Sequence, residues 1–200
     1  MAKRIYLDHN STTPVDPRVI EAMLPYYREC WGNASSLHQF GRQAKAGLEE
    51  SRETIAKVFN CSPDEIYFTS GGTESDNFAI KGTAYEYSDK GKHLITSKIE
   101  HPAVLESFEF LEEQGYETTY LSVDNHGFVD PDDLKKAIRP DTILVSIMYA
   151  NNEVGSVQPI KDLASICKQK GVIFHTDAVQ AAGKIPIDLA SEPIDLMSTS

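Results

Sequence analysis

The chain has 200 residues, of which 40% are hydrophobic and 24% are charged, a balance that excludes a disordered or disulfide-stapled chain as the main class. The 19 basic and 30 acidic residues give a net charge of −11, which argues against nucleic acid or an anionic membrane as the main partner but leaves a local phosphate site open. No apolar run approaches the roughly 18 residues of a membrane span, and the start MAKRIYLDHNSTTP lacks the apolar core of a signal peptide. An odd number of widely spaced cysteines, with no CxxC motif, predicts reduced thiols in a cytoplasmic protein: Cys30, Cys61 and Cys167.

The first third of the chain is predicted to be mainly helical. Residues 1–15 form an extended arm, and Asp16 and Pro17 are typical of a helix N-cap and first helical position. Pro25 interrupts the apolar pattern of this helix and leaves its end open. A loop at 31–38 and an amphipathic helix at 41–59 follow.

Strands and helices alternate over the rest of the chain, which predicts an α/β fold with a mainly parallel sheet. The expected strands cover residues 65–69, 93–97, 117–123, 142–148, 172–175 and 194–198. The expected helices begin at Thr73, Pro102, Pro131 and Ile160, and a short one covers 178–182. In such sheets ligands bind outside the carboxyl ends of the strands, so polar residues directly after each strand are the candidates for a site.

The segment TSGGTES, residues 69–75, lies between an expected strand and an expected helix. Its two glycines allow close approach of a ligand, and a helix N-terminus offers N–H groups to a phosphate. The segment lacks the GKS or GKT of a P-loop and is not GxGxxG. An ordinary turn with Thr73 as a helix N-cap is an equal alternative.

Three further polar groups follow expected strands. Asp177 can hold a protonated ring nitrogen, with a helix N-cap as the alternative. His101 can stack on a planar ligand or transfer protons, with a capping role as the alternative. Asn151 and Asn152 can orient a polar ligand, with a plain turn as the alternative. Together with the phosphate cradle, these groups suit a phosphorylated aromatic cofactor carrying a pyridinium, for which pyridoxal phosphate is the candidate. The histidines have no metal-like spacing, so no metal site is expected.

Several segments resemble one family over essentially the whole chain. The chain resembles the N-terminal half of a cysteine desulfurase, within the class V aminotransferase group of fold-type I pyridoxal-phosphate enzymes. The resemblance is carried by IYLDHNSTTPVDPRV, FGRQA, IYFTSGGTESDNFAIKG, SKIEHPAVLE, TILVSIMYANNEVGSVQPI, FHTDAVQAAGKIPID and DLMSTS. It implies that residues 16–200 form the large cofactor-binding domain of that fold, incomplete at its C-terminal end, and that residues 1–15 belong to the small domain.

The resemblance also implies roles for individual residues. It places Gly72, Thr73 and Ser200 at the cofactor phosphate, His101 on the pyridine ring as the catalytic proton-transfer group, Asn152 beside cofactor and substrate, Asp177 at the pyridine nitrogen and Gln180 at the ring hydroxyl. In the family, the Schiff-base lysine follows the serine that matches Ser200, and no lysine here matches it; Lys184 belongs to another motif. No cysteine of this chain matches the family's sulfur-accepting cysteine. The 200-residue chain alone is therefore expected to be inactive.

For a complete enzyme, the resemblance implies a homodimer that converts L-cysteine to L-alanine. The sulfur leaves as an enzyme persulfide, for an iron–sulfur scaffold or another acceptor protein. A selenocysteine lyase-like enzyme is a variant in substrate. Three readings of the chain stay open: a piece of a longer desulfurase, half of a two-chain enzyme, and a non-catalytic cofactor-binding or scaffold protein.

Overall fold

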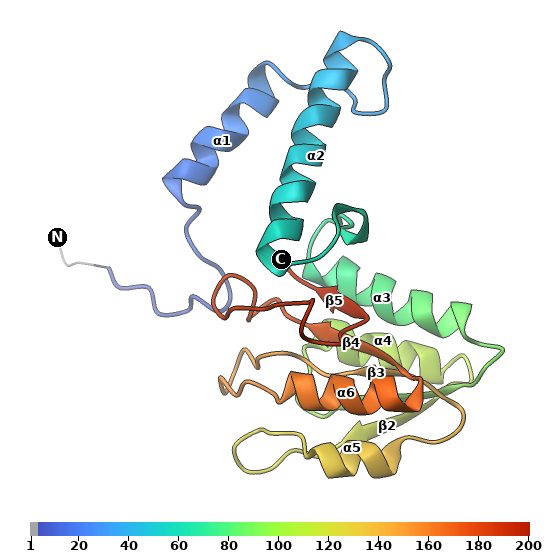
Figure 1. Ribbon diagram of the computed structural model, residues 1–200. Helices are drawn as coiled ribbons and strands as arrows, with labels where there is room; N and C mark the ends of the chain where they lie inside the picture. Colours follow the sequence, from blue (N-terminus) through green and yellow to red (C-terminus); the bar gives the residue numbers. More distant parts are fainter. Residues whose placement is uncertain (1–3) are drawn as a thin grey trace. The chain divides into compact units, whose positions relative to one another are not determined.

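The computed structural model describes residues 4–200, which group into two compact units, one up to Tyr67 and one from Phe68 to Ser200 (Figure 1). Each unit is described by itself. The division predicted from the resemblance, with a boundary after residue 15, concerns the domains of a whole enzyme and stays a prediction.

The first unit is helical. Asp16 caps α1 (Pro17–Arg28) by accepting the Arg18 N–H at 2.8 Å, as the sequence predicts. The helix runs through Pro25, whose carbonyl accepts the Glu29 N–H at 2.8 Å. The second helix, α2 (Gln39–Phe59), ends at Asn60 in a left-handed conformation (φ 55°), which asparagine tolerates better than most residues.

The strand expected at 65–69 is wrong. Residues Pro63–Glu65 form the 3-10 helix η1, and Ser62 and Glu65 form a capping box at its start. The carbonyl of Ile66 accepts the Arg52 guanidinium instead of a ladder bond. Among residues 4–200, no strand pairs with 66–69, so this apolar segment is extended without being part of a sheet.

The second unit contains a five-stranded sheet in the order β2-β1-β3-β4-β5, and all four strand pairs are parallel. This confirms the α/β class. The strands are β1 (His93–Ser97), β2 (Glu117–Leu121), β3 (Thr142–Ser146), β4 (Ile173–Asp177) and β5 (Leu196–Ser198). The helices are α3 (Gly72–Glu86), α4 (Pro102–Glu112), α5 (Pro131–Ala137) and α6 (Ile160–Lys170).

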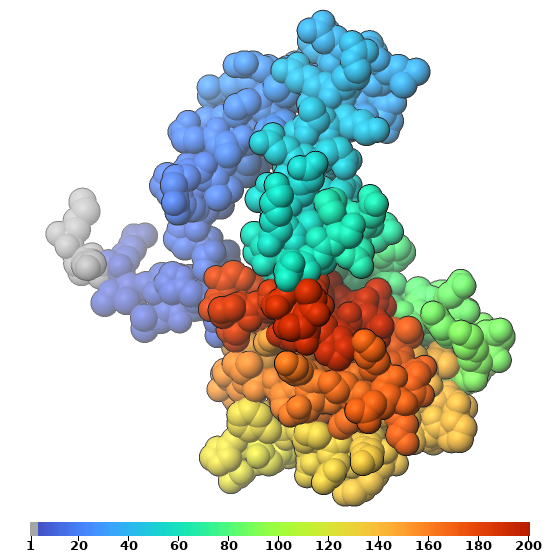
Figure 2. Space-filling view, in the orientation of Figure 1, coloured from blue at the N-terminus to red at the C-terminus, as the bar shows by residue number. Residues whose placement is uncertain are grey.

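Helices cover both faces of the sheet. α3 and α4 pack together on one face, while α5 and α6 lie side by side on the other, in yellow and orange in Figure 2. Every residue of the central strands β1 and β3 is buried, as expected for parallel strands covered on both faces. The core under α3 and α4 gathers Ile80, Leu94, Val104, Phe108 and Leu144.

The strand order creates a topological switch point between β1 and β3. The chain leaves β1 outward to β2 and then returns to β3 on the other side of β1. The connections that follow these two strands therefore diverge, which leaves a crevice at their carboxyl ends where ligands of this architecture bind. The carboxyl ends of all five parallel strands lie at this same edge, called the carboxyl edge below.

The helix expected at 178–182 is also wrong. The residues after β4 form successive turns in which Ala181 and Ala182 both donate to the Ala178 carbonyl, at 2.9 and 2.8 Å. The Ala178 N–H donates to the Ser198 carbonyl, and Gly183 takes a left-handed conformation (φ 75°). These contacts hold the chain against β5 and prevent a regular helix.

Candidate active site

Six of the seven predicted site residues come from loops or helix starts at the carboxyl edge, and the seventh ends a strand there. Asp177 is the last residue of β4 and is buried, with 5% of its surface exposed. Thr73, His101 and Ser200 are exposed, and Gly72, Asn152 and Gln180 are half-buried. The arrangement is a buried carboxyl group at an edge that also carries accessible polar groups.

The N-terminus of α3 has no side-chain cap. Its N-cap is Gly71, at φ 156° and ψ −179°, a conformation reached essentially by glycine alone. The alternative in which Thr73 is the N-cap is therefore wrong, because Thr73 is the second helical residue. A helix leaves its first N–H groups without intrahelical partners, so this terminus can bind an anion.

Gly72 brings three segments of the edge together. A Cβ atom at this position would lie 2.7 Å from Cγ2 of Val179 and 3.7 Å from Cβ of Ser200. The start of α3, the turn after β4 and the residues after β5 are thus in close contact. The three residues predicted to bind the cofactor phosphate therefore lie close together in this unit: Gly72, Thr73 and Ser200.

Asp177 and His101 interact electrostatically. One Asp177 oxygen accepts the Val179 N–H at 2.9 Å. Burial raises the pKa of Asp177, and the Val179 N–H and the His101 ring act against this rise. His101 is the N-cap of α4, and its Nδ1 accepts the Ala103 N–H at 3.1 Å, so Nε2 carries the proton in the neutral ring. His101 thus caps a helix and also keeps an exposed ring beside a buried carboxylate.

The two asparagines after β3 differ. Asn151 is buried, and its side chain donates to the Ile99 carbonyl at 2.8 Å and accepts the Glu153 and Val154 N–H groups, each at 2.8 Å. It therefore ties the loop after β3 to the loop after β1. The amide of Asn152 is half-buried and donates to Glu153 Oε1 at 3.1 Å. Of the pair, Asn152 is the less buried, and its predicted contact with a ligand stays a prediction.

Gln180 lies in the turns after β4, close in the chain to Asp177. Its side-chain oxygen accepts from Lys184 Nζ at 2.6 Å. Lys184 is four residues further along the same segment, so this hydrogen bond joins two parts of the turns.

Sequence reasoning assigned nothing to Glu100, although it directly precedes His101. Glu100 is buried, and its Oε1 accepts the Ser97 hydroxyl and, at 3.0 Å, the Met148 N–H. It therefore joins the ends of β1 and β3 across the switch point. Burial raises the pKa of Glu100 to about 8, and Oε2 has no hydrogen-bond partner among the described residues. Its position between a strand end and His101 was the available signal.

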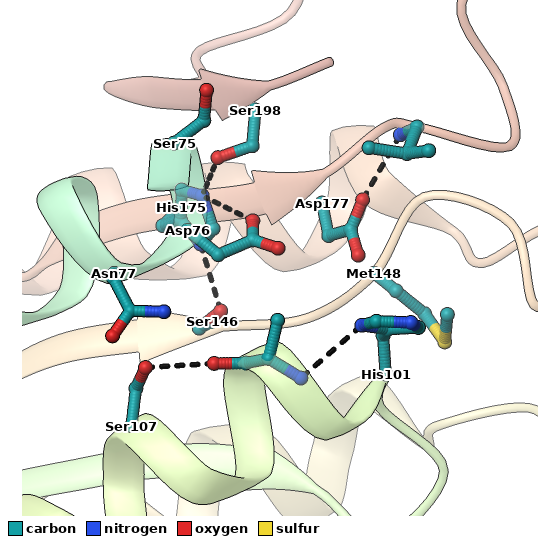
Figure 3. A network of polar contacts seen from close by, with 12 residues as sticks. Ser75, Asp76, Asn77, His101, Ser107, Ser146, Met148, His175, Asp177 and Ser198 are labelled. Carbon is teal, nitrogen blue, oxygen red and sulfur yellow. Dashed lines mark hydrogen bonds and ion pairs between the residues drawn. The ribbon is translucent and has the colours of Figure 1, made fainter. Parts of the chain in front are cut away.

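A second buried group was also missed. His175 of β4 lies among Ser146, Ser198 and Asp76, which come from β3, β5 and α3 (Figure 3). His175 and Asp76 are 0% and 1% exposed. A histidine two residues before Asp177 in a buried strand was the signal that could have found this network.

Other parts of the described chain offer no competing site of this kind. No group of histidines, cysteines and carboxylates among residues 4–200 could hold a metal ion. No described helix is long and apolar enough to cross a membrane. A cavity of about 380 Å³ lies at the other end of the strands, before β3 and β4, and is lined in part by Arg139, Thr142 and Val172.

The groups at the carboxyl edge match the three chemical parts of pyridoxal phosphate. The uncapped start of α3 suits a phosphate, the buried Asp177 suits a protonated ring nitrogen, and the exposed His101 ring suits a flat aromatic face. The donor set of this edge therefore fits that cofactor.

Comparison with known sequences shows the family to which the chain belongs. The family profile described as aminotransferase class-V matches residues 5–200. A cysteine desulfurase IscS of Dictyoglomus turgidum is 56% identical over 200 residues, which make up 100% of this chain and 51% of that protein. A cysteine desulfurase IscS of Methanosarcina thermophila is 54% identical over 198 residues, 99% of this chain and 49% of that protein. The chain spans about half the length of these curated relatives.

Solved structures agree with the sequence comparison. A protein described as NifS-like superposes with a TM-score of 0.95 and 44% identity, over 98% of this chain and 55% of that one. A structure described as SspA in complex with cysteine superposes with a TM-score of 0.95 and 40% identity, over 98% of this chain and 56% of that one.

Proposed function

The chain belongs to the class-V aminotransferase family, and on this premise we propose that its carboxyl edge is the cofactor site of a pyridoxal-phosphate enzyme that releases sulfur from L-cysteine. The observation that carries the proposal is the buried Asp177 carboxyl group at the same edge as the uncapped start of α3. The desulfurase relatives and the cysteine complex named above support cysteine as the substrate.

Different residues of this chain bind different parts of the cofactor. Gly72, Thr73 and Ser200 bind the phosphate. When bound, pyridoxal phosphate serves as an electron sink for charge that develops at the substrate α-carbon. Asp177 keeps a proton on the ring nitrogen through a charge-assisted hydrogen bond, and this proton sustains the sink.

The remaining residues orient and move protons. His101 would stack on the ring face, and its imidazole would transfer a proton between substrate atoms. Asn152 orients the substrate side of the cofactor, and Gln180 donates to the ring hydroxyl. We assign the catalytic role in this chain to His101, since an imidazole is the side chain among these groups best suited to general acid–base catalysis.

In the complete protein, the products are L-alanine and sulfur held as an enzyme persulfide. An iron–sulfur scaffold or another acceptor protein receives the sulfur, and the enzyme is a cytoplasmic homodimer. Residues 1–15 form part of its small domain, and residues 16–200 part of its large domain. The Schiff-base lysine and the sulfur-accepting cysteine have no match in these 200 residues, so this chain alone does not turn over cysteine.

The test is product analysis with the natural protein that carries this chain. With pyridoxal phosphate, L-cysteine and a reductant, we expect alanine and sulfide in equal amounts. Replacing His101 with alanine should lower the rate by about 100-fold or more, as for loss of a general acid–base group. His126, in an exposed loop, is the matched control, and its replacement should leave the rate unchanged.

Other products would contradict the proposal. A keto acid in place of alanine would indicate amino transfer, and turnover of selenocysteine alone would indicate the lyase variant. Equal rates for the His101 and His126 variants would remove His101 from the catalytic role.

A further inference from the structure

A buried imidazole joins four elements beneath the cofactor site. His175 Nδ1 lies 2.8 Å from the Ser146 hydroxyl of β3, and Nε2 lies 2.9 Å from the Ser198 hydroxyl of β5. Asp76 of α3 approaches Nε2 with its Oδ1 at 3.7 Å (Figure 3). Both ring nitrogens are therefore engaged inside the core.

The residues of this network belong to the same elements as the proposed cofactor residues. His175 and Asp177 are two residues apart on β4, so their side chains leave the same face of the sheet. Asp76 belongs to the helix whose start holds Gly72 and Thr73, and Ser198 lies two residues before Ser200. A shift of this imidazole would move several cofactor contacts together.

The charges in this network are unequal. Asp76 is buried and its Oδ1 has no hydrogen-bond partner among the described residues. Burial and the nearby Asp177 raise the pKa of Asp76 to about 7, while the Ser198 hydroxyl opposes the rise. Burial lowers the pKa of His175 to about 3, so the ring is neutral and cannot balance two carboxylates.

Two further titratable groups act on these residues, Glu100 and His101, and they also favour a charged Asp177 and a protonated Asp76. Glu100 lies across the switch point, and both Asp177 and Asp76 add to the rise in its pKa. His101 acts in the opposite sense on Asp177 alone. The charge is thus most stable on Asp177, and a proton on Asp76 relieves the like-charge repulsion.

We propose that Asp76 and His175 are positioning residues for Asp177: their network with Ser146 and Ser198 fixes the end of β4 against β3, β5 and α3, and with it the Asp177 carboxyl group that accepts from the ring nitrogen. This inference rests on the proposed cofactor site. It adds that the acceptor's orientation and charge depend on two residues that do not touch the cofactor. Residues of such a supporting layer commonly change ligand affinity by 10- to 100-fold.

The test measures pyridoxal-phosphate affinity in the natural protein, stripped of cofactor and titrated at about pH 6, where Asp76 is protonated. We expect His175→Ala and Asp76→Ala to weaken binding by about tenfold or more. Asp76→Asn should bind within about threefold of the unchanged protein, because an amide mimics the neutral acid. The pH midpoint of the cofactor's visible absorption band should shift in His175→Ala and stay in place in Asp76→Asn.

Tyr116→Phe is the matched control. It removes a buried hydrogen bond, from the Tyr116 hydroxyl to the Ala84 carbonyl at 2.7 Å, before β2 and away from the carboxyl edge. It should lower thermal stability without changing cofactor affinity or the absorption band. If His175→Ala does not fold, the contrast between Asp76→Ala and Asp76→Asn decides the question.

The outcomes separate the inference from the proposed function. If the unchanged protein binds no pyridoxal phosphate, the proposed function fails. If it binds the cofactor, and the alanine variants bind equally well, the inference alone is wrong. Asp76→Asn binding as weakly as Asp76→Ala, or Tyr116→Phe weakening binding as much as His175→Ala, would also overturn it.

Discussion

At the scale of residues, three buried carboxyl groups compete for charge at one edge of the sheet. Desolvation disfavours the ionised form of each, and every ionised neighbour adds repulsion. Asp177 has a backbone N–H donor and the His101 ring in its favour. Glu100 accepts two hydrogen bonds through Oε1, but Glu100 Oε2 and Asp76 Oδ1 are buried with no hydrogen-bond partner among the described residues. A cation at Asp177 would relieve this excess of negative potential, which is the electrostatic reason a pyridinium suits the site.

Glu100 makes a pH dependence of stability testable. Its pKa rises from an ordinary 4.5 to about 8 in the folded chain, so the folded state binds this proton more tightly than the unfolded state. The contribution of Glu100 to the free energy of unfolding is therefore fully present below about pH 4.5 and is lost as the pH rises through about 8. Glu100→Gln removes the titrating group and should flatten this decline.

The measurement is thermal unfolding of the natural protein at about pH 5 and about pH 9. Glu100→Gln should match the unchanged protein at the lower pH and melt higher at the upper pH, by roughly 2–4 °C per kcal/mol regained. The exposed Glu106 is the control, and Glu106→Gln should follow the unchanged protein at both values. Equal curves for Glu100→Gln and the unchanged protein would mean that Glu100 does not carry a buried proton.

At the scale of elements, the start of α3 and the turn after β4 are fitted to each other. Because a Cβ at position 72 would lie 2.7 Å from Val179 Cγ2, Gly72→Ala should destabilise the protein by about 1–3 kcal/mol through overpacking. Val179→Ala makes room, so the double variant should recover part of that loss. A double-mutant cycle by denaturant unfolding measures the coupling, which should be at least about 0.5 kcal/mol. Strictly additive effects would contradict the contact.

The elements that sequence patterns predicted are those whose signals are local. The apolar runs of β1 and β3, the proline starts of α4 and α5 and the glycine after α6 each lie within a few residues. The segment at 65–69 has an apolar pattern, but a strand needs a partner, and none of the described strands pairs with it. Residues 178–182 were expected to be helical, but a contact with Ser198, distant in sequence, directs them into turns.

The candidate site divides in the same way. Asp177 ends β4 and His101 comes four residues after β1, so the general rule for parallel sheets was enough to single them out. The importance of Glu100 and His175 arises from partners 48 residues away at Met148, 29 at Ser146 and 23 at Ser198. Sequence position could mark the two residues as near the site, but their partners could not be predicted, because these contacts exist only once β1, β3, β4 and β5 are aligned.

At the scale of the whole molecule, the chain contains only part of the catalytic groups proposed for the enzyme. It spans about half the length of its curated relatives, and the residues proposed to hold the cofactor are gathered in the unit from Phe68 to Ser200. The proposed Schiff-base lysine and sulfur-accepting cysteine have no match in these 200 residues.

The most direct test of the cofactor site is pyridoxal-phosphate binding by the natural protein, followed by its visible absorption, in comparison with Asp177→Ala. We expect the unchanged protein to bind the cofactor, and Asp177→Ala to weaken binding by about tenfold or more and to shift the band, since the charge-assisted bond to the ring nitrogen contributes about 1.5–3 kcal/mol. Asp89→Ala, at an exposed turn, should change neither. The same affinity and spectrum in Asp177→Ala as in the unchanged protein would contradict the account.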